Sequence, residues 1–239
     1  MLNIAKKGLL LLGMLASVAA FASSDIHLDK APVNLSDNAS LQRGAKTFVN
    51  YCLTCHSAAY MRYNRLQDIG MSEQDIKGLI LTGAKIGDLM TIALDKKEAK
   101  AWFGAAPPDL TVISRSRGAD WLYTYLRGFY RDDSRPSGWN NVAFDKVGMP
   151  HVLYELQGVQ ALHHEGKEDH AGKLVLETPG KMKPAEYDAM VGDLVNYLVF
   201  MGEPVKAKRF TLGIFVLLFL GVLLVVSYKL KKEFWKDIH

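Results

Sequence analysis

An uncharged apolar segment near the C-terminus sets the first constraint on the fold. It reads FTLGIFVLLFLGVLLVVSY and spans Phe210 to Tyr228, 19 residues without a charged side chain. As an α-helix it would be about 28 Å long, close to the hydrocarbon thickness of a bilayer. A buried helix of a soluble core is the alternative, but such a helix rarely lacks charge over this length. The segment predicts a membrane span at about 210–228, within a C-terminal anchor region covering 205–239.

The N-terminus has the pattern of an export signal. Residues 1–22 carry Lys6 and Lys7, continue with an apolar run and end in Ala20-Phe21-Ala22, the small-residue pattern that precedes signal cleavage. An N-terminal membrane anchor is the alternative, but the apolar run is short. We expect a cleaved signal peptide over 1–22, an exported domain over 23–204, and a C-terminal tail that stays in the cytoplasm.

The formal net charge of +4 at pH 7 is unevenly distributed along the chain. The signal contributes +2 and the residues after Glu203 contribute +5, which leaves −3 for the exported body. A mildly acidic body argues against a nucleic-acid partner and permits a basic protein partner.

The exported body is predicted to be mainly α, with long loops. Helices are expected from about Ser40 into the cysteine motif, after the Ser72–Asp75 capping box, around ADWLYTYLRG up to Gly128, and from Pro184 to Met201. The segments 105–118 and 131–150 are rich in Pro, Gly, Asn and Asp, and they are predicted to be loops. A small hairpin is expected within 159–182. Loops this long in a small body pack well only around something apolar.

Both cysteines of the chain lie in one motif, Cys52-Leu-Thr-Cys55-His56. A thioredoxin-like redox pair would need a strand in a βαβ context, whereas the flanking pattern is helical. A zinc site would need ligands from a distant histidine cluster in a polar loop. The third interpretation, covalent attachment of haem c, fits best. Two thiols one helical turn apart can reach the vinyl groups on one porphyrin edge, and His56 is then carried beneath the iron as the proximal ligand.

A second axial ligand has to come from elsewhere in the chain. A methionine thioether is a soft, neutral ligand that raises the haem potential. Met149 lies in KVGMPHV, a Gly/Pro loop far from the motif that can hold one side chain rigidly. We expect Met149 to be the distal ligand, with Met182 in the GKMKP loop and His151 as alternatives.

The chain resembles the bacterial cytochrome c1 family, the haem subunit of the cytochrome bc1 complex. The resemblance rests on RGAKTFVNYCLTCHSAAYMRYNRL, PPDL, GMPHVLYELQG, VNYLVFMGEP and the single C-terminal anchor, and it extends across nearly the whole mature chain. It implies a cytochrome c-type helical haem domain with one covalently attached haem c. Cys52 and Cys55 would hold the haem, and His56 and Met149 would be its iron ligands.

The resemblance also implies roles for two further segments. The PPDL loop lines the histidine side of the haem in this family, so the carbonyl group of Pro107 or Pro108 is expected to accept a hydrogen bond from His56 Nδ1. Arg115 is expected to pair with a haem propionate, a natural use of a bidentate cation. Arg117 is its nearby rival for that role.

The implied function is electron transfer, with no bond of a substrate made or broken at the haem. The chain would take electrons from a Rieske iron–sulfur protein and pass them to a c-type cytochrome. It would lie beside cytochrome b in a complex, expected to be dimeric, of the bacterial inner membrane, with its haem domain in the periplasm. Two other functions stay open: an autonomous membrane-anchored cytochrome c that shuttles electrons, and a haem c subunit of a terminal oxidase.

Overall fold

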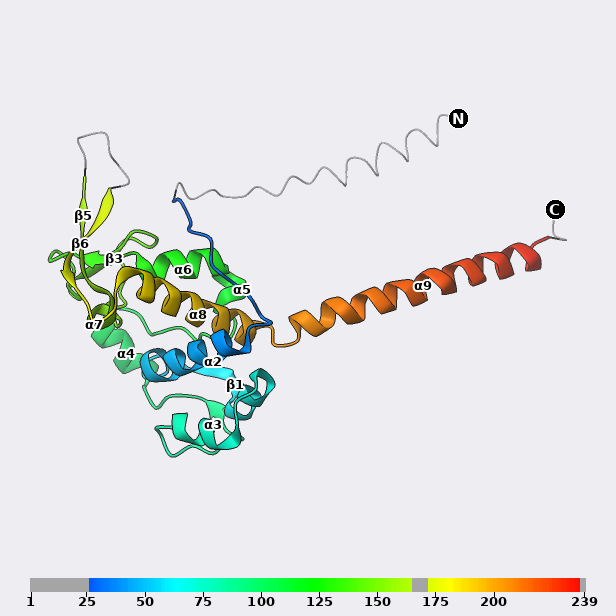
Figure 1. Cartoon of the computed structure of the whole chain (residues 1–239), viewed down its shortest axis with the longest axis horizontal. Coiled ribbons are helices and arrows are strands. Elements are labelled where there is room, and N and C mark those ends of the chain that lie inside the picture. The colour runs from blue at the N-terminus through cyan, green and yellow to red at the C-terminus, as the bar shows by residue number, and fades with distance from the viewer. Residues whose placement is uncertain (1–25, 165–171, 237–239) are drawn as a thin grey trace.

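The computed structural model describes residues 26–164 and 172–236, which form a body and one long C-terminal helix (Figure 1). Helices are the main regular elements of the body, which confirms the predicted mainly α class. In chain order the elements are α2 (Asn38–Thr47), the π-helical η1 (Phe48–Cys52), β1 (Ala58–Arg62), the 3-10 helix η2 (Tyr63–Ile69), α3 (Glu73–Leu79), β2 (Leu89–Met90), α4 (Lys96–Phe103), α5 (Ile113–Arg117), α6 (Ala119–Arg127), β3 (Phe129–Arg131), β4 (Trp139–Asn141), α7 (Tyr154–Gln157), β5 (Gly158–His163), β6 (Lys173–Pro179), α8 (Pro184–Gly202) and α9 (Lys206–Phe234). The predicted signal peptide lies outside the described residues.

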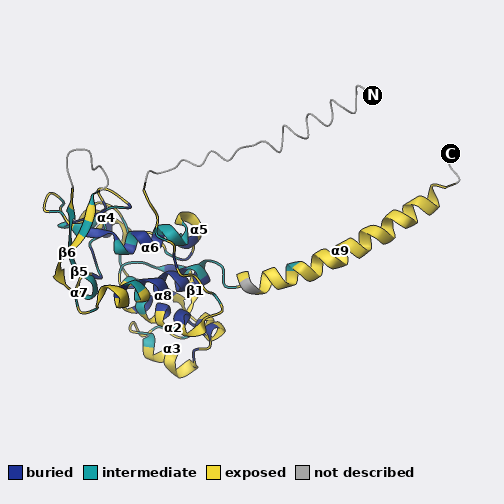
Figure 2. Cartoon of the chain, turned by 45° about the horizontal axis from the view of Figure 1, so that its top comes forward, coloured by how far each residue is buried: buried dark blue, intermediate teal, exposed yellow. Residues whose placement is uncertain are grey.

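Helices α2 and α8 form the centre of the body, where the buried residues concentrate (Figure 2). The ring of Phe48, just after α2, lies 5.6 Å from that of Tyr197 on α8, and both side chains are fully buried. A Cβ atom at Gly44 would collide with the carbonyl oxygen of Asp193. Glycine therefore permits a close approach of the two helices, and burial of their apolar faces stabilises the fold.

An N-terminal arm, residues 26–37, contains no helix or strand and is fastened to α6 and α8. The backbone N–H of Asp29 donates to Thr124 Oγ1 at 2.8 Å. Arg127 on α6 pairs with Asp29 at 2.7 Å and with Asp188 on α8 at 2.6 Å. One guanidinium thus ties the arm to both helices.

The helix ends follow their capping residues closely. The Ser72–Asp75 capping box is present at α3, α6 ends at Gly128, and α8 begins at Pro184, all as predicted. The start of α2 differs, because Asp37 is its cap and accepts a hydrogen bond from Ser40 N at 3.0 Å. The helix therefore begins two residues earlier than Ser40.

Short elements also form where the sequence predicted loops. The expected hairpin is present as β5–β6, which projects from the body (Figure 1). However, β4 lies within 131–150 and pairs with β3, and α5 lies within 105–118, so both loop predictions were partly wrong. Tertiary contacts rather than local sequence set these elements. Asn141 in β4, for example, donates from Nδ2 to the Tyr125 carbonyl oxygen at 2.7 Å.

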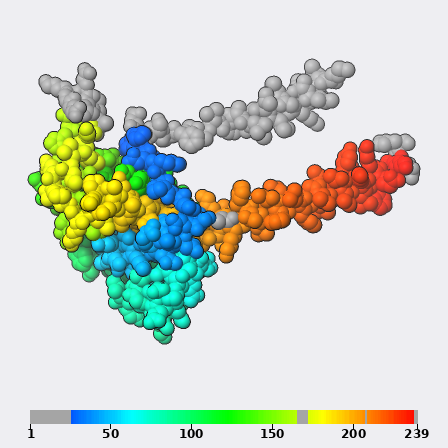
Figure 3. All heavy atoms as spheres, viewed as in Figure 1, coloured from blue at the N-terminus to red at the C-terminus, as the bar shows by residue number. Residues whose placement is uncertain are grey.

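The C-terminal helix α9 extends away from the body, and its side chains are exposed along almost its full length (Figures 2 and 3). In the described part of the chain, Lys208–Phe234 is the one helix long and apolar enough to cross a membrane. Three residues separate α8 from α9, and Glu203 in this joint forms an ion pair with Arg209. The body therefore connects to the apolar helix without a flexible linker.

Candidate functional site

A tight turn brings the cysteine motif together at the end of the α2–η1 helix. Within η1, Leu53 N donates to Phe48 O at 3.0 Å, one residue further than α-helical spacing. The carbonyl oxygen of Cys52 then accepts from both Cys55 N at 3.1 Å and His56 N at 2.9 Å. The turn therefore presents two thiols and an imidazole on one short loop anchored to the core.

The two thiols are not joined to one another. Cys52 and Cys55 are both free and half-buried. Burial, with a smaller contribution from the neighbouring Cys55, raises the pKa of the Cys52 thiol to about 12. The motif ends a helix and not a strand, so it lacks the setting of a thioredoxin-like pair. Among residues 26–164 and 172–236, no group of three or more His, Cys, Asp or Glu side chains could hold a metal ion.

The segment that follows α4 fixes the orientation of His56. Its Nδ1 lies 2.8 Å from the carbonyl oxygen of Pro108, so the bond falls to this proline rather than to Pro107. Because a carbonyl oxygen only accepts, Nδ1 carries the proton and Nε2 keeps its lone pair. Burial lowers the pKa of His56, although the bond to Pro108 acts in the opposite direction. The ring is thus neutral, with a defined tautomer whose Nε2 could bind a metal.

Asp109 clamps the PPDL segment to the start of β1. Its carboxylate accepts from Ala59 N at 2.7 Å and from Thr111 N at 2.9 Å, while Leu110 N donates to Ser57 O at 2.9 Å. Burial acts to raise the pKa of Asp109, but hydrogen bonds from Thr111 and Ala59 outweigh it and lower the pKa below its usual value. The sequence interpretation did not single out Asp109, although an Asp two residues before Thr is a turn-forming pattern.

Met149 lies against aromatic residues of α6 and β3. The hydroxyl group of Tyr125 donates to Met149 Sδ at 3.3 Å. The Tyr125 ring stacks on Trp121 at 4.8 Å, because residues four apart share one face of helix α6, and it meets Phe129 of β3 edge-on at 5.1 Å. Burial raises the pKa of Tyr125, which keeps its hydroxyl protonated. No signal in the sequence indicated the bond to sulfur, because the two residues lie 24 positions apart in the chain.

A short segment joins the two halves of the site. A Cβ atom at Gly148 would lie 2.8 Å from the carbonyl oxygen of Phe103, the last residue of α4, so the Met149 loop rests on that helix end. Five residues further along the chain, Pro108 contacts His56. Five residue steps span at most about 18 Å. The structure therefore brings the His56 turn and the Met149 loop to the two ends of one short segment.

The two alternative distal ligands have different surroundings. The His151 ring stacks on Phe129 at 4.8 Å and meets Trp139 edge-on at 5.1 Å. Within the described part of the chain, its Nε2 is buried without a hydrogen-bond partner, and burial lowers the pKa of His151 to about 4. Met182 packs against the main core, where its backbone N–H bonds to Leu156 O at 3.0 Å. Two aromatic rings thus restrain His151, whereas the Met149 sulfur is oriented by Tyr125.

The two candidate arginines contact different parts of the body. Arg117 Cζ lies 5.0 Å from the centre of the Trp121 ring and 5.7 Å from that of Phe144. Arg115 lies instead beside the end of α8, where a Cβ atom at Gly202 would be 3.5 Å from its Cγ. The structure therefore brings Arg117, and not Arg115, to the aromatic group around Met149.

The chemistry of these residues fits a covalently held haem. Two free thiols separated by one turn suit two vinyl groups, and the Nε2 lone pair of His56 suits an iron atom. The Met149 sulfur has two lone pairs, so it can accept a hydrogen bond and still bind a metal. The donors are neutral or soft, as histidine–methionine ligation of a haem requires.

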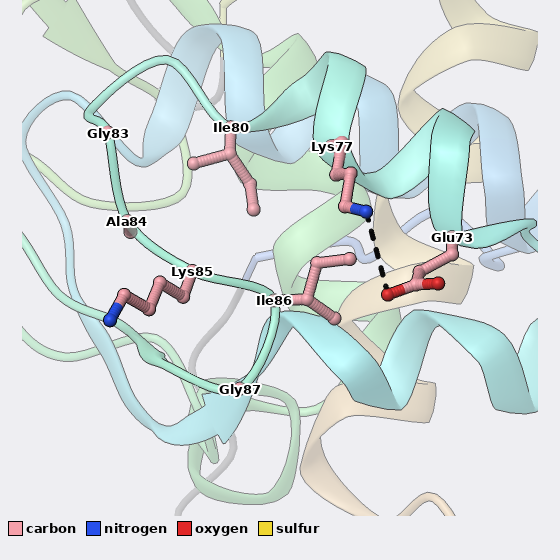
Figure 4. Close-up of a pocket in the computed structure, with 8 residues that line it drawn as sticks. All are labelled: Glu73, Lys77, Ile80, Gly83, Ala84, Lys85, Ile86 and Gly87. Carbon is pink, nitrogen blue, oxygen red and sulfur yellow. Dashed lines mark ion pairs between the residues drawn. The ribbon is translucent and has the colours of Figure 1, made fainter.

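A separate hollow lies beside α3 and opens to solvent (Figure 4). Lys77 and Glu73 form an ion pair there at 3.7 Å, and both side chains are mostly exposed. Its other lining residues are Ile80, Gly83, Ala84, Lys85, Ile86 and Gly87. It contains none of the site residues described above, and we assign it no role.

A helical body with a Cys-x-x-Cys-His turn and a single apolar tail helix define a membrane-anchored c-type cytochrome. A family model described as "Cytochrome C1 family" matches residues 29–238. The chain is 59% identical to a Nitrosomonas europaea protein named ammonia monooxygenase gamma subunit, over 98% of both chains. It is 50% identical to cytochrome c1 of Allochromatium vinosum, over 95% of this chain and 96% of that one. Cytochrome c1 of Rhodospirillum rubrum is 29% identical over 100% and 99% of the two chains.

The chain belongs to the cytochrome c1 family. Proteins of this family carry a covalently bound haem c, so membership confirms the predicted cofactor. Membership also confirms the predicted function as an electron-transfer subunit. It favours this function over that of a tethered shuttle or of an oxidase subunit. The C-terminal apolar helix α9 is accordingly a single-pass membrane anchor.

Proposed function

We propose that the chain is the haem c subunit of a cytochrome bc1 complex, taking electrons from a Rieske iron–sulfur protein and passing them to a c-type cytochrome. It would lie beside cytochrome b in a complex expected to be dimeric. The observation that carries this proposal is the family match over residues 29–238, which includes both the cysteine motif and the anchor.

The proposed roles of the site residues follow from their geometry. Cys52 and Cys55 would form thioethers with the haem, while His56 Nε2 and Met149 Sδ would be axial ligands. When bound, the haem supplies a one-electron iron couple. The carbonyl group of Pro108 holds the His56 tautomer and raises its basicity through the 2.8 Å bond.

Arg117 is the better-placed partner for a haem propionate. It lies over Trp121, which stacks on the Tyr125 ring that contacts Met149. Arg115, the residue expected from the resemblance, lies at the end of α8 instead. Replacing each arginine by glutamine tests the choice, because loss of a propionate partner should shift the haem potential in one variant only.

We propose that the haem domain is periplasmic and the C-terminal tail cytoplasmic, in a bacterial inner membrane. The export signal expected over 1–22 supports this orientation, because it would send the predicted domain over 23–204 across the membrane and leave the end of 205–239 behind. The structure supports the same boundary, since α8 ends at Gly202 and α9 begins at Lys206. Protease treatment of intact spheroplasts should degrade the haem domain and spare a C-terminal epitope; the reverse pattern would contradict the proposed orientation.

The acidic exported body supports transient docking of a basic electron acceptor. Its net charge of −3 would speed encounters with a positively charged partner, and this effect weakens as salt screens the charges. Acceptor reduction should therefore slow as ionic strength rises.

The name of the Nitrosomonas europaea relative suggests a second function, as a subunit of an ammonia-oxidising enzyme. That relative is 59% identical and matches over nearly the whole chain. Association with other proteins separates the two candidates, because an ammonia monooxygenase subunit should purify with an enzyme that consumes oxygen when ammonia is added.

Purification from the native membrane tests the proposal. The full chain carrying a C-terminal tag is solubilised in mild detergent, and the co-purifying proteins are identified. We expect cytochrome b, a Rieske protein and quinol-dependent reduction of a c-type cytochrome. Ammonia-dependent oxygen uptake would support the second function, a haem–copper subunit would support an oxidase, and purification of the chain alone would support a shuttle. Cys52→Ser is the control that should lose covalent haem staining.

A further inference from the structure

We propose that the hydroxyl group of Tyr125 positions the distal ligand and raises the haem potential through its hydrogen bond to Met149. This inference rests on the proposed function, in which Met149 Sδ is an axial ligand. It assigns to Tyr125 a role beyond packing. Tyr125 contacts Met149 and would act through it, so it is a positioning residue.

The geometry of the contact suits a hydroxyl-to-thioether hydrogen bond. Tyr125 Oη lies 3.3 Å from Met149 Sδ. A thioether sulfur has two lone pairs and can accept only weakly, so one lone pair can receive the hydroxyl proton while the other faces a metal. The bond fixes which lone pair remains available. It therefore selects one orientation of a flexible methionine side chain, which has three rotatable bonds.

Tyr125 is itself held in place by two ring contacts and one backbone hydrogen bond. It stacks on Trp121 at 4.8 Å and meets Phe129 edge-on at 5.1 Å. Its backbone carbonyl oxygen accepts from Asn141 Nδ2 at 2.7 Å, which joins α6 to β4. Because these contacts involve the ring and the backbone, removal of the hydroxyl group alone should leave the ring in position.

The same bond should change the electronic character of the ligand. A proton donor on the sulfur withdraws electron density, so the thioether becomes a weaker donor toward iron. Weaker donation destabilises the ferric state relative to the ferrous state, and the potential rises. A neutral hydrogen bond has a small net effect, so we expect its loss to change the ferrous-to-ferric equilibrium two- to fivefold. At 59 mV per tenfold for one electron, this is about 20–40 mV.

Tyr125→Phe in the complex purified with its haem tests the inference. The measurements are a redox titration of the haem, the far-red charge-transfer absorption of a ferric iron–thioether bond, and carbon monoxide binding to the ferrous form. The matched control is Tyr123→Phe, on the same helix. The Tyr123 hydroxyl donates to the carbonyl oxygen of Asp188 at 3.4 Å, in a different part of the body.

We expect Tyr125→Phe to lower the haem potential, which corresponds to a two- to fivefold change in the ferrous-to-ferric equilibrium, and to shift the charge-transfer absorption. Tyr123→Phe should match the wild type in both measurements. Loss of that absorption together with carbon monoxide binding would equally support a positioning role. An unchanged potential and an unchanged absorption in Tyr125→Phe would overturn the inference. Met149→Leu, measured in parallel, separates failure of the inference about Tyr125 from failure of the ligand assignment. If this variant keeps the absorption, Met149 is not the distal ligand.

Discussion

His56 and Pro108 are joined by a hydrogen bond of 2.8 Å between the imidazole Nδ1 and a backbone carbonyl oxygen. Because the acceptor belongs to the backbone, no side-chain replacement at Pro108 removes it directly. The position of that carbonyl group depends on Asp109, which fastens the segment to Ala59 and Thr111. Asp109 is therefore the side chain through which the His56 environment can be altered.

Asp109→Asn should weaken the acid dependence of stability. The pKa of Asp109 lies below its usual value in the folded protein. The ionised carboxylate therefore contributes stability above the unfolded pKa, and this contribution is lost as the pH falls through the folded pKa. At neutral pH the variant should be less stable by about 1 kcal/mol. Thermal unfolding of the wild type and of Asp109→Asn, measured from neutral pH down to about pH 3, checks this. If the unfolding midpoints of both proteins fall in parallel as the pH is lowered, the prediction is wrong.

Met149→Leu should lower the haem potential sharply and allow carbon monoxide to bind, because the iron loses a thioether ligand. The shift should exceed that of Tyr125→Phe. Redox titration and absorption spectra measure both effects. Met182→Leu is the matched control, since Met182 packs against the main core. If the control loses ligation and Met149→Leu does not, the distal ligand is Met182.

Gly148→Ala should displace the Met149 loop. The added Cβ would lie 2.8 Å from the Phe103 carbonyl oxygen, closer than packed atoms allow, so the loop must move off the end of α4. We expect partial loss of methionine ligation, measured as the fraction of ferrous protein that binds carbon monoxide. Gly87→Ala is the control, because no atom lies within 4 Å of a Cβ there. Similar carbon monoxide binding by both variants would argue against the loop contact.

Ending the chain after Val205 should release a folded, haem-bearing body from the membrane. The side chains of α9 are exposed along almost its whole length, so its loss removes no core contact. Haem-stained protein should move from the membrane pellet to the soluble fraction, with an unfolding midpoint close to that of the full chain. A body that aggregates or loses its haem would show that α9 supports the fold.

Local signals predicted a large part of the fold. The capping box at Ser72, the proline at the start of α8 and the glycine at the end of α6 each act within a few residues, so the sequence alone indicated these boundaries. The cysteine motif and the apolar tail were equally readable, because their chemistry depends on spacing and composition within one segment.

Contacts between distant segments could not be predicted in the same way. The β3–β4 pair depends on Asn141 reaching the backbone of α6, and the Tyr125–Met149 bond joins residues 24 positions apart. Likewise, choosing Arg117 over Arg115 requires knowing that Trp121 lies beneath one and the end of α8 beside the other. Such partners become visible only when the helices are packed.

The three-residue joint between α8 and α9 limits how the haem domain can move. Glu203 in the joint pairs with Arg209 on the first turn of α9, so the joint holds the body close to the start of the membrane anchor. A carrier on a long tether could search for its partners, but this domain has no such reach. The electron donor and acceptor would therefore have to come to the haem domain, because the joint gives it no tether on which to search for them.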